Sequence, residues 1–405
     1  MKSLNKITNT YFFLLILIGC FGLVFLSSLK FDYLYWVILI ILLFKGGFAT
    51  NIKESTSGKL IILYISFLFL SCVYSWLFNQ QSLYVCVVHS FNYFSILFFF
   101  VLFKCKLSAQ QTEKVILWIS LSFCVCYIIQ WLIYPTILFS SAGDTININE
   151  DEFRMRMSGS LCAYILFLMG FNRFIVTKKV TYVIYSIIAM FPIIVQGFRS
   201  LIALTLTALI LLILSTTKKR INTFAYILVI IMLLFSLSSL PIVRDKIDEM
   251  EQRQLSDQTF DNEDYIRYLS LDYFWNTQFS KPYEKIFGGG NPVDTRSKYY
   301  KSIKLAERYY YFYWVDLGII GLAMIIGFPA VVCLLLMYLL CIYKFKEPQY
   351  QYVRWGLVVV LVGSIFTSKE LFRDGNILLL SLFLYLEYIC HYKRPLKMAK
   401  TNVKM

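Results

Sequence analysis

The sequence predicts an all-α polytopic membrane protein, and three features support this prediction. Of the 405 residues, 59% are hydrophobic and only 16% are charged, whereas ordinary soluble domains are roughly 45–50% apolar and about 25% charged. The mean hydropathy is +0.65. The apolar residues fall in runs of about 20, the length that crosses the hydrocarbon core of a bilayer as a helix. A soluble globular enzyme and a disordered chain are therefore excluded.

Read in order, the apolar runs predict about twelve transmembrane helices. They lie near 11–29, 31–44, 59–77, 83–103, 115–139, 157–172, 181–198, 200–215, 221–240, 309–342, 353–368 and 375–391. The first run is long and lacks a small-x-small cleavage site, so we interpret it as a retained helix rather than a secretory signal. The run 309–342 is too long for one straight span, and we expect it to begin outside the bilayer.

The basic charge predicts which side of the membrane each loop faces. Twelve spans place both termini on one side. If that side is cytoplasmic, the inner segments, including a basic tail at 392–405, carry a net charge of +18 and the outer segments −3. This asymmetry follows the positive-inside rule. It accounts for the formal charge of +15 without nucleic acid as a partner.

Most of the polar residues lie in two outer loops. A short one at 140–156 interrupts the helices of 1–240, and a large one at 241–308 precedes the last three spans at 309–391. Apolar residues near helical spacing predict surface helices at 240–256 and 262–276. The sequence Gly288-Gly289-Gly290-Asn291-Pro292 indicates a flexible turn, and it lacks the Gly-Lys-Ser/Thr of a phosphate loop.

The histidine and cysteine content predicts neither a metal site nor a disulfide framework in the outer loops. The chain has only two histidines, His89 and His391, and no cysteine lies in the large loop. A zinc site normally needs four closely spaced cysteine and histidine ligands. We therefore expect no metal and no cofactor.

Five arginines near the predicted outer face are candidates for binding a polyanionic head group, such as a lipid-linked diphosphate. They are Arg154, Arg156, Arg199, Arg267 and Arg308. A guanidinium binds phosphate oxygens bidentately and keeps its charge at every relevant pH. For Arg199 the alternative is a short exposed turn in which the guanidinium reaches water. For the other four arginines the alternative is a salt bridge with the acidic residues of the outer loops.

The aromatic string 309–314 has two interpretations. Tyr309, Tyr310 and Trp314 belong to it, and such residues form interfacial belts at the edge of a bilayer. The alternative is that a sugar stacks on these rings. Asp316 follows at the head of an apolar run, where an acid is costly, so we interpret it as a partner of Arg308 or as a general base.

These features together resemble the O-antigen polymerase and ligase superfamily of bacterial envelope polysaccharide synthesis. The resemblance covers roughly 140–345 and depends on the order of short motifs: QGFRSLIAL around Arg199, Arg267 ahead of Phe274-Trp275, IFGGGNP, and RYYYFYWVDLGIIGL. Ligases of this superfamily carry a catalytic His-Asn where this chain has tyrosines near Tyr309 and Tyr310. That departure favours a polymerase over a ligase.

The resemblance implies a GT-C-like glycosyltransferase of the bacterial inner membrane, acting on the periplasmic side. Its donor would be an undecaprenyl-diphosphate-linked glycan, and its other partners membrane lipid and a chain-length regulator. Arg199, Arg267 and Arg308 would stabilise the departing diphosphate without a metal. Asp316 would accept the proton of the acceptor hydroxyl. The residues expected to bind substrate are Arg154, Arg156, Tyr309, Tyr310 and Trp314.

Other functions remain open at the level of the sequence. A lipid-linked oligosaccharide flippase has a similar size, but flippases generally hold charges inside their spans, whereas here the main such residue is Glu387. A non-catalytic membrane protein explains neither the arginines nor the long loop. Within the enzyme class, an O-antigen ligase and a capsule-repeat polymerase are the alternatives.

Overall fold

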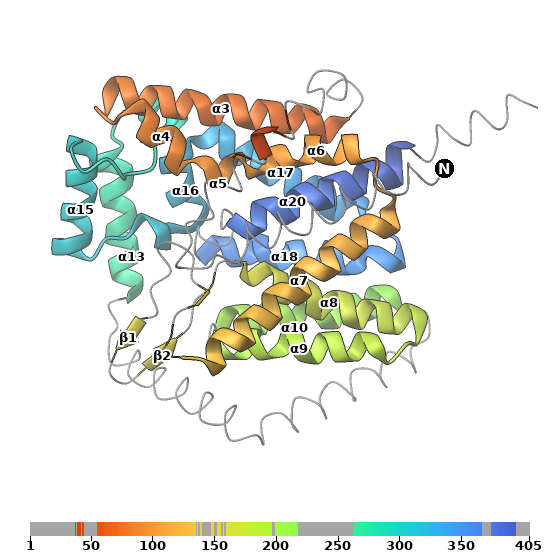
Figure 1. Cartoon of the computed structure of the whole chain (residues 1–405). Helices are drawn as coiled ribbons and strands as arrows, with labels where there is room; N and C mark the ends of the chain where they lie inside the picture. Colours follow the sequence, from red (N-terminus) through yellow and green to blue (C-terminus); the bar gives the residue numbers. More distant parts are fainter. Residues whose placement is uncertain are drawn as a thin grey trace, which may run out of the picture.

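The structure is a computed structural model (Figure 1). It describes residues 55–134, 136, 138–139, 147–149, 152–154, 157, 159–196, 199–217, 263–366 and 374–393, with five further positions between 37 and 43. The predicted spans at 11–29 and 221–240, the surface helix at 240–256 and most of the basic tail lie outside the described residues.

The described residues are helical apart from one short antiparallel ribbon. The first half contains α3 (Thr56–Phe78), α4 (Leu83–His89), α5 (Phe91–Phe94), η1 (Ser95–Leu97), α6 (Phe98–Cys105), α7 (Ala109–Leu132), β1 (Asn147–Asn149), β2 (Glu152–Arg154), α8 (Ser160–Thr177), α9 (Thr181–Val195) and α10 (Arg199–Thr216). The second half contains α13 (Glu263–Asp272), η2 (Tyr273–Gln278), α14 (Pro282–Phe287), α15 (Lys298–Tyr310), η3 (Trp314–Leu317), α16 (Gly318–Ile326), α17 (Phe328–Lys344), η4 (Pro348–Tyr350), α18 (Gln351–Phe366), α20 (Asp374–Tyr388) and η5 (Ile389–Lys393). In the ribbon, Ile148 pairs with Phe153.

Several helices are long and apolar enough to cross a membrane. Three of them, α3, α7 and α8, meet that test alone, and two bent pairs of helices raise the number to five among the described residues. Four shorter apolar helices accompany them, at 181–195, 200–216, 328–344 and 376–391. The chain is therefore an α-helical membrane protein by the length and composition of its helices.

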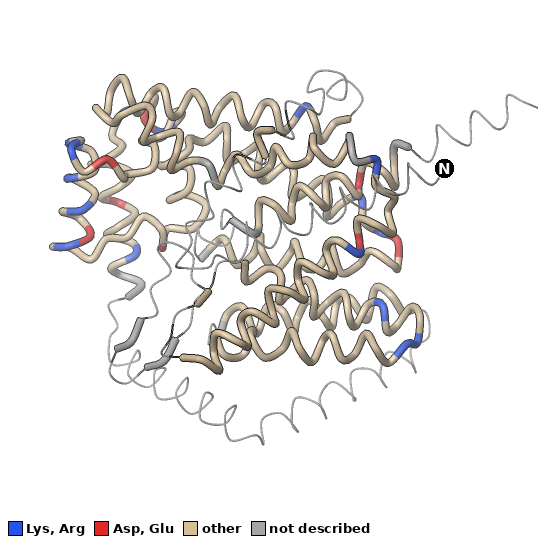
Figure 2. The backbone as a smooth tube through the Cα atoms, viewed as in Figure 1, with Lys and Arg blue, Asp and Glu red and all other residues tan. Residues whose placement is uncertain are grey.

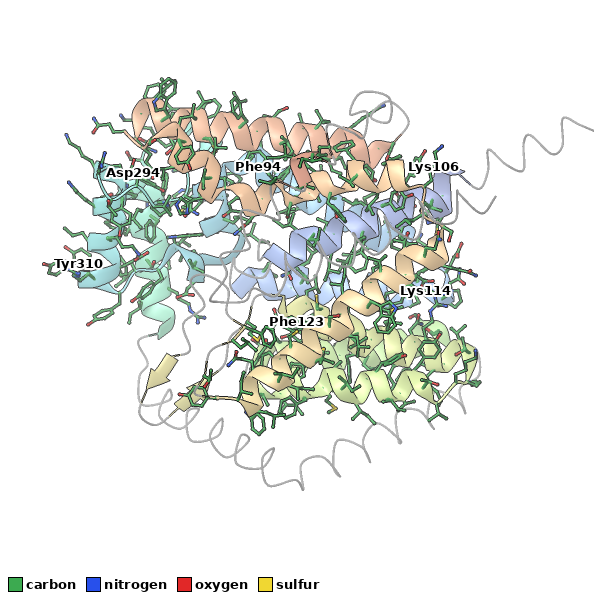
Figure 3. All side chains as sticks on the ribbon, in the orientation of Figure 1. Phe94, Lys106, Lys114, Phe123, Asp294 and Tyr310 are labelled. Atoms are coloured by element: carbon green, nitrogen blue, oxygen red, sulfur yellow. The ribbon has the colours of Figure 1, made fainter. Side chains whose placement is uncertain are left out.

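Charged residues of the described part gather at two opposite ends of the molecule, and the helices between them are almost free of charge (Figure 2). Lys106 and Lys114 lie at one end, and Asp294 and Tyr310 lie at the other (Figure 3). Because charge is expensive in hydrocarbon, this distribution is what two membrane faces require. We call the end that contains α13 and α15 the outer end.

Within the described residues the apolar runs correspond closely to helices, and one difference has a local cause. The helix α7 begins six residues before the predicted run at 115–139. A capping box explains this: the Ser108 hydroxyl accepts a hydrogen bond from the Gln111 N–H at 3.3 Å, and the Gln111 side chain accepts one from the Ser108 N–H at 2.9 Å. Such a box satisfies helix donors that otherwise lack partners, so the helix extends past its apolar part.

Two predicted runs are broken rather than straight. The run 83–103 bends by 56° between α4 and the segment 92–103. The run 309–342 is interrupted at Tyr311, which has a φ of 57°, and again at Gly327, which has a φ of 86°. An 87° bend separates α15 from the segment 314–326. The prediction that 309–342 is not one straight span is confirmed.

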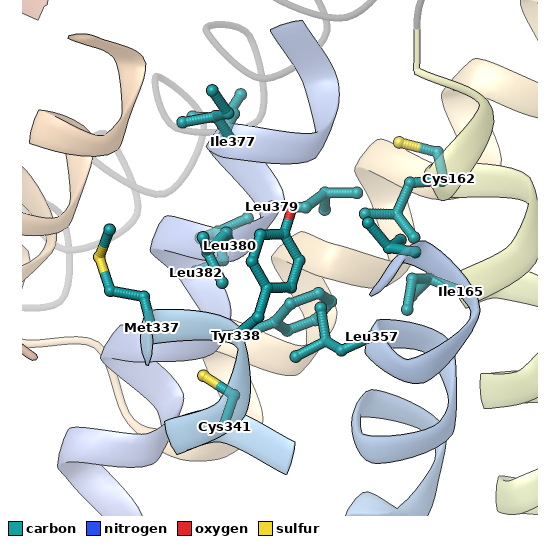
Figure 4. Close-up of a cluster of buried hydrophobic side chains, with 14 of the residues drawn as sticks. Cys162, Ile165, Met337, Tyr338, Cys341, Leu357, Ile377, Leu379, Leu380 and Leu382 are labelled. Carbon is teal, nitrogen blue, oxygen red and sulfur yellow. The ribbon is translucent and has the colours of Figure 1, made fainter. Parts of the chain in front are cut away.

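The apolar core joins two groups of helices. One group holds α7, α8, α9 and α10, the other holds α3, α6, α16, α17 and α20, and α18 contacts both groups (Figure 1). In the core, Tyr338 of α17 lies among Leu357 of α18 and Leu379 and Leu380 of α20 (Figure 4). Helices that pack this closely need small residues where they touch. A Cβ on Gly170 of α8 would lie only 2.6 Å from the backbone oxygen of Tyr182 in α9.

Candidate functional site

The outer end is built by the segment 263–317, which belongs to the predicted large loop and the start of the following run. Its helices α13, α14 and α15 are short, and α13 continues into the π-helical turn η2. The predicted surface helix at 262–276 is thus confirmed as helical. π-helical turns of this kind often occur at functional sites.

The triple glycine is a buried attachment point rather than the flexible turn that the sequence indicated. The carbonyl oxygen of Gly289 accepts hydrogen bonds from Ser75 Oγ at 2.6 Å, Asn79 Nδ2 at 3.0 Å and Gln81 Nε2 at 3.3 Å. Its N–H donates to the carbonyl of Met324 at 2.7 Å. The segment is therefore held between the end of α3 and the end of α16.

The glycines are required there by space and by backbone conformation. Gly288 has a φ of 75°, and an added Cβ would lie 2.5 Å from the backbone nitrogen of Gly327. A side chain would clash with backbone that cannot move aside, and glycine alone adopts this φ at no cost. The outer helices are thus positioned by contacts with the transmembrane part.

A small hollow of about 160 Å³ lies between α13 and η3. It is lined by Ile266, Arg267, Ser270, Tyr311, Tyr313, Asp316 and Leu317. Arg267 and Asp316 are both exposed, and neither forms an ion pair with another described residue. Ser270, one helical turn after Arg267, is buried, and its hydroxyl has no hydrogen-bond partner among the described residues. The small hollow therefore offers a ligand an exposed cation and an exposed carboxylate, with the buried Ser270 hydroxyl beside them.

A larger, shallower cavity of about 600 Å³, the basic groove, adjoins the small hollow and shares Tyr313 with it. It is lined by Tyr300, Lys301, Lys304, Leu305, Glu307, Arg308, Tyr309 and Tyr313. Lys304 is paired with Glu307, whereas Lys301 and Arg308 have no ion-pair partner among the described residues. Pockets for drug-sized ligands measure about 300–1,000 Å³, so the basic groove has room for several sugar rings and the small hollow for about one.

Four of the predicted site residues thus line adjoining cavities. Arg267 and Asp316 share the small hollow, and Arg308 and Tyr309 share the basic groove. The ion pair between Asp316 and Arg308 that the sequence allowed is not formed; Tyr311, which ends α15 with a φ of 57°, lies between them in the chain.

Two other predicted site residues, Tyr310 and Trp314, line neither cavity. Tyr310 stacks on Phe312, with ring centroids 5.6 Å apart. Trp314 is 8% exposed, so its ring packs into the protein instead of facing a ligand. Arg199 begins α10 and Arg154 ends β2.

The side chains of Arg199 and Arg154 lie outside the described residues, as does the whole of Arg156.

Sequence reasoning missed Ser270, Lys301 and Lys304. The lysines could have been recognised, because residues 301, 304 and 308 follow one face of a helix at spacings of three and four. Ser270 had no such signal, since a serine inside a helix is common. Only the structure singles it out, because its hydroxyl is buried without a hydrogen-bond partner among the described residues.

Local electrostatics distinguish two further groups at the outer end. The pKa of Asp294 is lowered by hydrogen bonds from the backbone N–H groups of Ser82 and Arg296, at 2.9 and 3.1 Å. The pKa of Tyr273 is raised by burial and by the nearby Tyr310, so its hydroxyl stays protonated. Among the described residues no three histidine, cysteine or acidic side chains lie close enough to hold a metal ion.

No family model matches the chain, and no curated protein or solved structure matches it either.

Proposed function

We propose that the chain is a membrane glycosyltransferase that polymerises lipid-linked glycan repeat units, in the manner of an O-antigen polymerase. The observation that carries the proposal is the small hollow. Arg267 and Asp316, both singled out in the sequence, line it together without an ion-pair partner among the described residues, and the basic groove with Arg308 adjoins it. A cation and a carboxylate at one sugar-sized site are the two groups that glycosyl transfer from a diphosphate needs.

In the proposed reaction the acceptor hydroxyl oxygen attacks the anomeric carbon of the donor glycan. The bond from that carbon to the diphosphate oxygen breaks, and the lipid diphosphate leaves with the electron pair. Asp316 accepts the proton of the acceptor hydroxyl. Arg267 and Arg308 stabilise the negative charge that develops on the diphosphate.

The proposal includes the arrangement expected from the sequence. The chain would have about twelve spans in a GT-C-like arrangement, with both termini in the cytoplasm of a bacterium and the outer end in the periplasm. The donor would be an undecaprenyl-diphosphate-linked glycan, held in the inner membrane, and a chain-length regulator would act beside the enzyme. The gathering of described charges at two ends supports a two-sided layout of this kind (Figure 2).

The test is a gel profile of surface polysaccharide from a strain that lacks the gene, complemented with variants. The wild-type gene should restore a ladder, and Arg267→Ala should leave the lipid core with a single repeat unit at normal protein level. Arg296→Ala is the matched control, because Arg296 is an exposed arginine of the outer end that lines neither cavity.

The deletion strain also separates the alternatives. Single repeat units on the core mean a polymerase, since transport and ligation must still work. Long lipid-linked chains that never reach the core would mean a ligase. Single units trapped on the cytoplasmic face would mean a flippase, and the proposed function would be wrong.

A further inference from the structure

The basic groove carries more positive than negative charge. Three cations line it against one carboxylate, Glu307, and that carboxylate is paired with Lys304. Lys301 and Arg308 are left without an ion-pair partner among the described residues. Unpaired cations in one concave site raise the local concentration of anions and hold them, so the groove is built for a negatively charged ligand.

The position of the groove limits which part of a lipid-linked glycan reaches it. All but one of its lining residues belong to α15. This helix lies at the outermost edge of the outer end, further from the charge-free helices than α13 (Figure 1). A lipid diphosphate stays near its membrane anchor, whereas the glycan extends outward. Arg308 is the cation of the groove that is assigned to the diphosphate, so Lys301 and Lys304, which precede it on the same helix, are left to face sugars beyond the reacting one.

The lining of the groove also fits a glycan better than a small ion. Tyr300, Tyr309 and Tyr313 place three aromatic rings beside the cations, and Tyr309 is 69% exposed. Tyrosine offers an apolar face with a polar tip, which suits sugar rings. A cavity of about 600 Å³ accommodates a ligand of several rings.

We propose that the basic groove binds an acidic glycan, so that the repeat unit handled by this protein carries a negative charge of its own, either the carboxylate of an acidic sugar or a phosphate within the repeat. This inference rests on the proposed function. It adds the substrate class, which the polymerase assignment leaves open. Lys301 and Lys304 become specificity-determining residues.

The experiment measures binding of surface glycan to the purified full-length protein in nanodiscs of zwitterionic lipid. The glycan is released from its lipid, so it has lost the diphosphate. It is used in three forms: native, with carboxylates reduced to alcohols, and with phosphates removed by aqueous hydrofluoric acid. We expect the native form to bind and one treated form to bind at least about tenfold more weakly, which names the source of the charge.

Variants connect that binding to the groove. Lys301→Gln should weaken binding of the native glycan about twofold to fivefold, the range for one exposed charge pair, and Lys301→Gln with Lys304→Gln should weaken it further. Lys298→Gln is the control, because Lys298 is exposed on the same helix and lines neither cavity. Raising the ionic strength from about 0.1 M to about 1 M shortens screening from about 10 Å to about 3 Å. It should weaken wild-type binding more than that of the double variant.

Three results would overturn the inference: equal binding of all three forms, binding of the lipid-linked glycan alone, or a native glycan without anionic groups. The polymerisation ladder is a separate measurement. If the protein restores the ladder but binds all three forms equally, only the acidic-glycan inference is wrong. If it binds acidic glycan but does not restore the ladder, the proposed function is wrong.

Discussion

A buried ion pair near the end opposite the site allows the sharpest test of the packing. Glu113 of α7 is paired with Arg173 of α8, and the same Glu113 oxygen accepts a hydrogen bond from the hydroxyl of Tyr352 of α18 at 3.2 Å. The side chains of Glu113 and Arg173 are only 9% and 16% exposed. This cluster therefore ties three helices together, and Arg173→Ala should leave the Glu113 carboxylate buried without its cation.

The expected cost follows from that burial. Removing one partner of a buried ion pair costs about 3–5 kcal/mol, mostly because the other charge stays behind. At about 2 °C per kcal/mol, the lower end for larger domains, the melting temperature should fall by roughly 6–10 °C. Tyr352→Phe removes one hydrogen bond to a charged group and should cost less, about 1.5–3 kcal/mol.

The assay is thermal unfolding of the full-length protein in detergent, followed by intrinsic fluorescence. Lys179→Ala is the control, because Lys179 is exposed just beyond α8 and should melt like the wild type. Combining Glu113→Gln with Arg173→Met removes both charges and should recover at least half of the loss. The reasoning fails if Arg173→Ala melts with the control, or if the double variant is no more stable than Arg173→Ala.

Three further predictions concern the backbone, the acid range and the chemistry. Gly318→Ala should destabilise the protein by roughly 2 kcal/mol or more, because Gly318 has a φ of 59° and an added Cβ would lie 2.2 Å from the backbone oxygen of Ile365. Gly356→Ala is the control: its added Cβ would meet only flexible side-chain ends, so this variant should melt closer to the wild type in the same assay. The pKa of Asp294 is lowered in the folded protein, so its contribution to stability is present above its unfolded pKa of about 3.9 and disappears as pH falls through the folded value. Asp294→Asn should flatten the acid limb of the melting profile, and an unchanged limb would contradict this. Asp316→Asn should abolish the polysaccharide ladder without shifting the melting temperature, because Asp316 is exposed in the small hollow; a normal ladder would exclude it as the base.

The positions of the helices could be predicted because a bilayer restricts the backbone. In hydrocarbon every backbone polar group needs an internal partner, so a run of about 20 apolar residues is a helix almost regardless of its detailed sequence. The runs that became α3, α8, α9 and α18 agree with the structure to within a few residues. Ends and bends were harder to predict, because they depend on single residues such as the cap at Ser108 and the left-handed Tyr311.

The candidate site could be predicted only residue by residue. Residue type alone marked Arg267, Arg308 and Asp316: arginine binds phosphate oxygens bidentately, and an acid at the head of an apolar run is costly. Their grouping could not be predicted, because Asp316 is close to Arg308 in sequence yet lines the small hollow with Arg267 from another helix. Which cavity Asp316 lines depends on the direction of the chain after α15, and the backbone conformation at Tyr311 sets that direction.

The glycine segment attaches the part of the chain that lines the two cavities to the transmembrane helices. A sequence of three glycines indicates flexibility when its neighbours are unknown, yet here the Gly289 carbonyl accepts three side-chain hydrogen bonds from the region around the end of α3, and its N–H bonds to α16. The segment before α15 and the segment after η3 are therefore attached to the same transmembrane helices. The small hollow and the basic groove, which share Tyr313, both belong to this attached segment. A glycan held in the groove would present its reacting sugar to Arg267 and Asp316 at a set distance, and such positioning lowers the entropic cost of reaction.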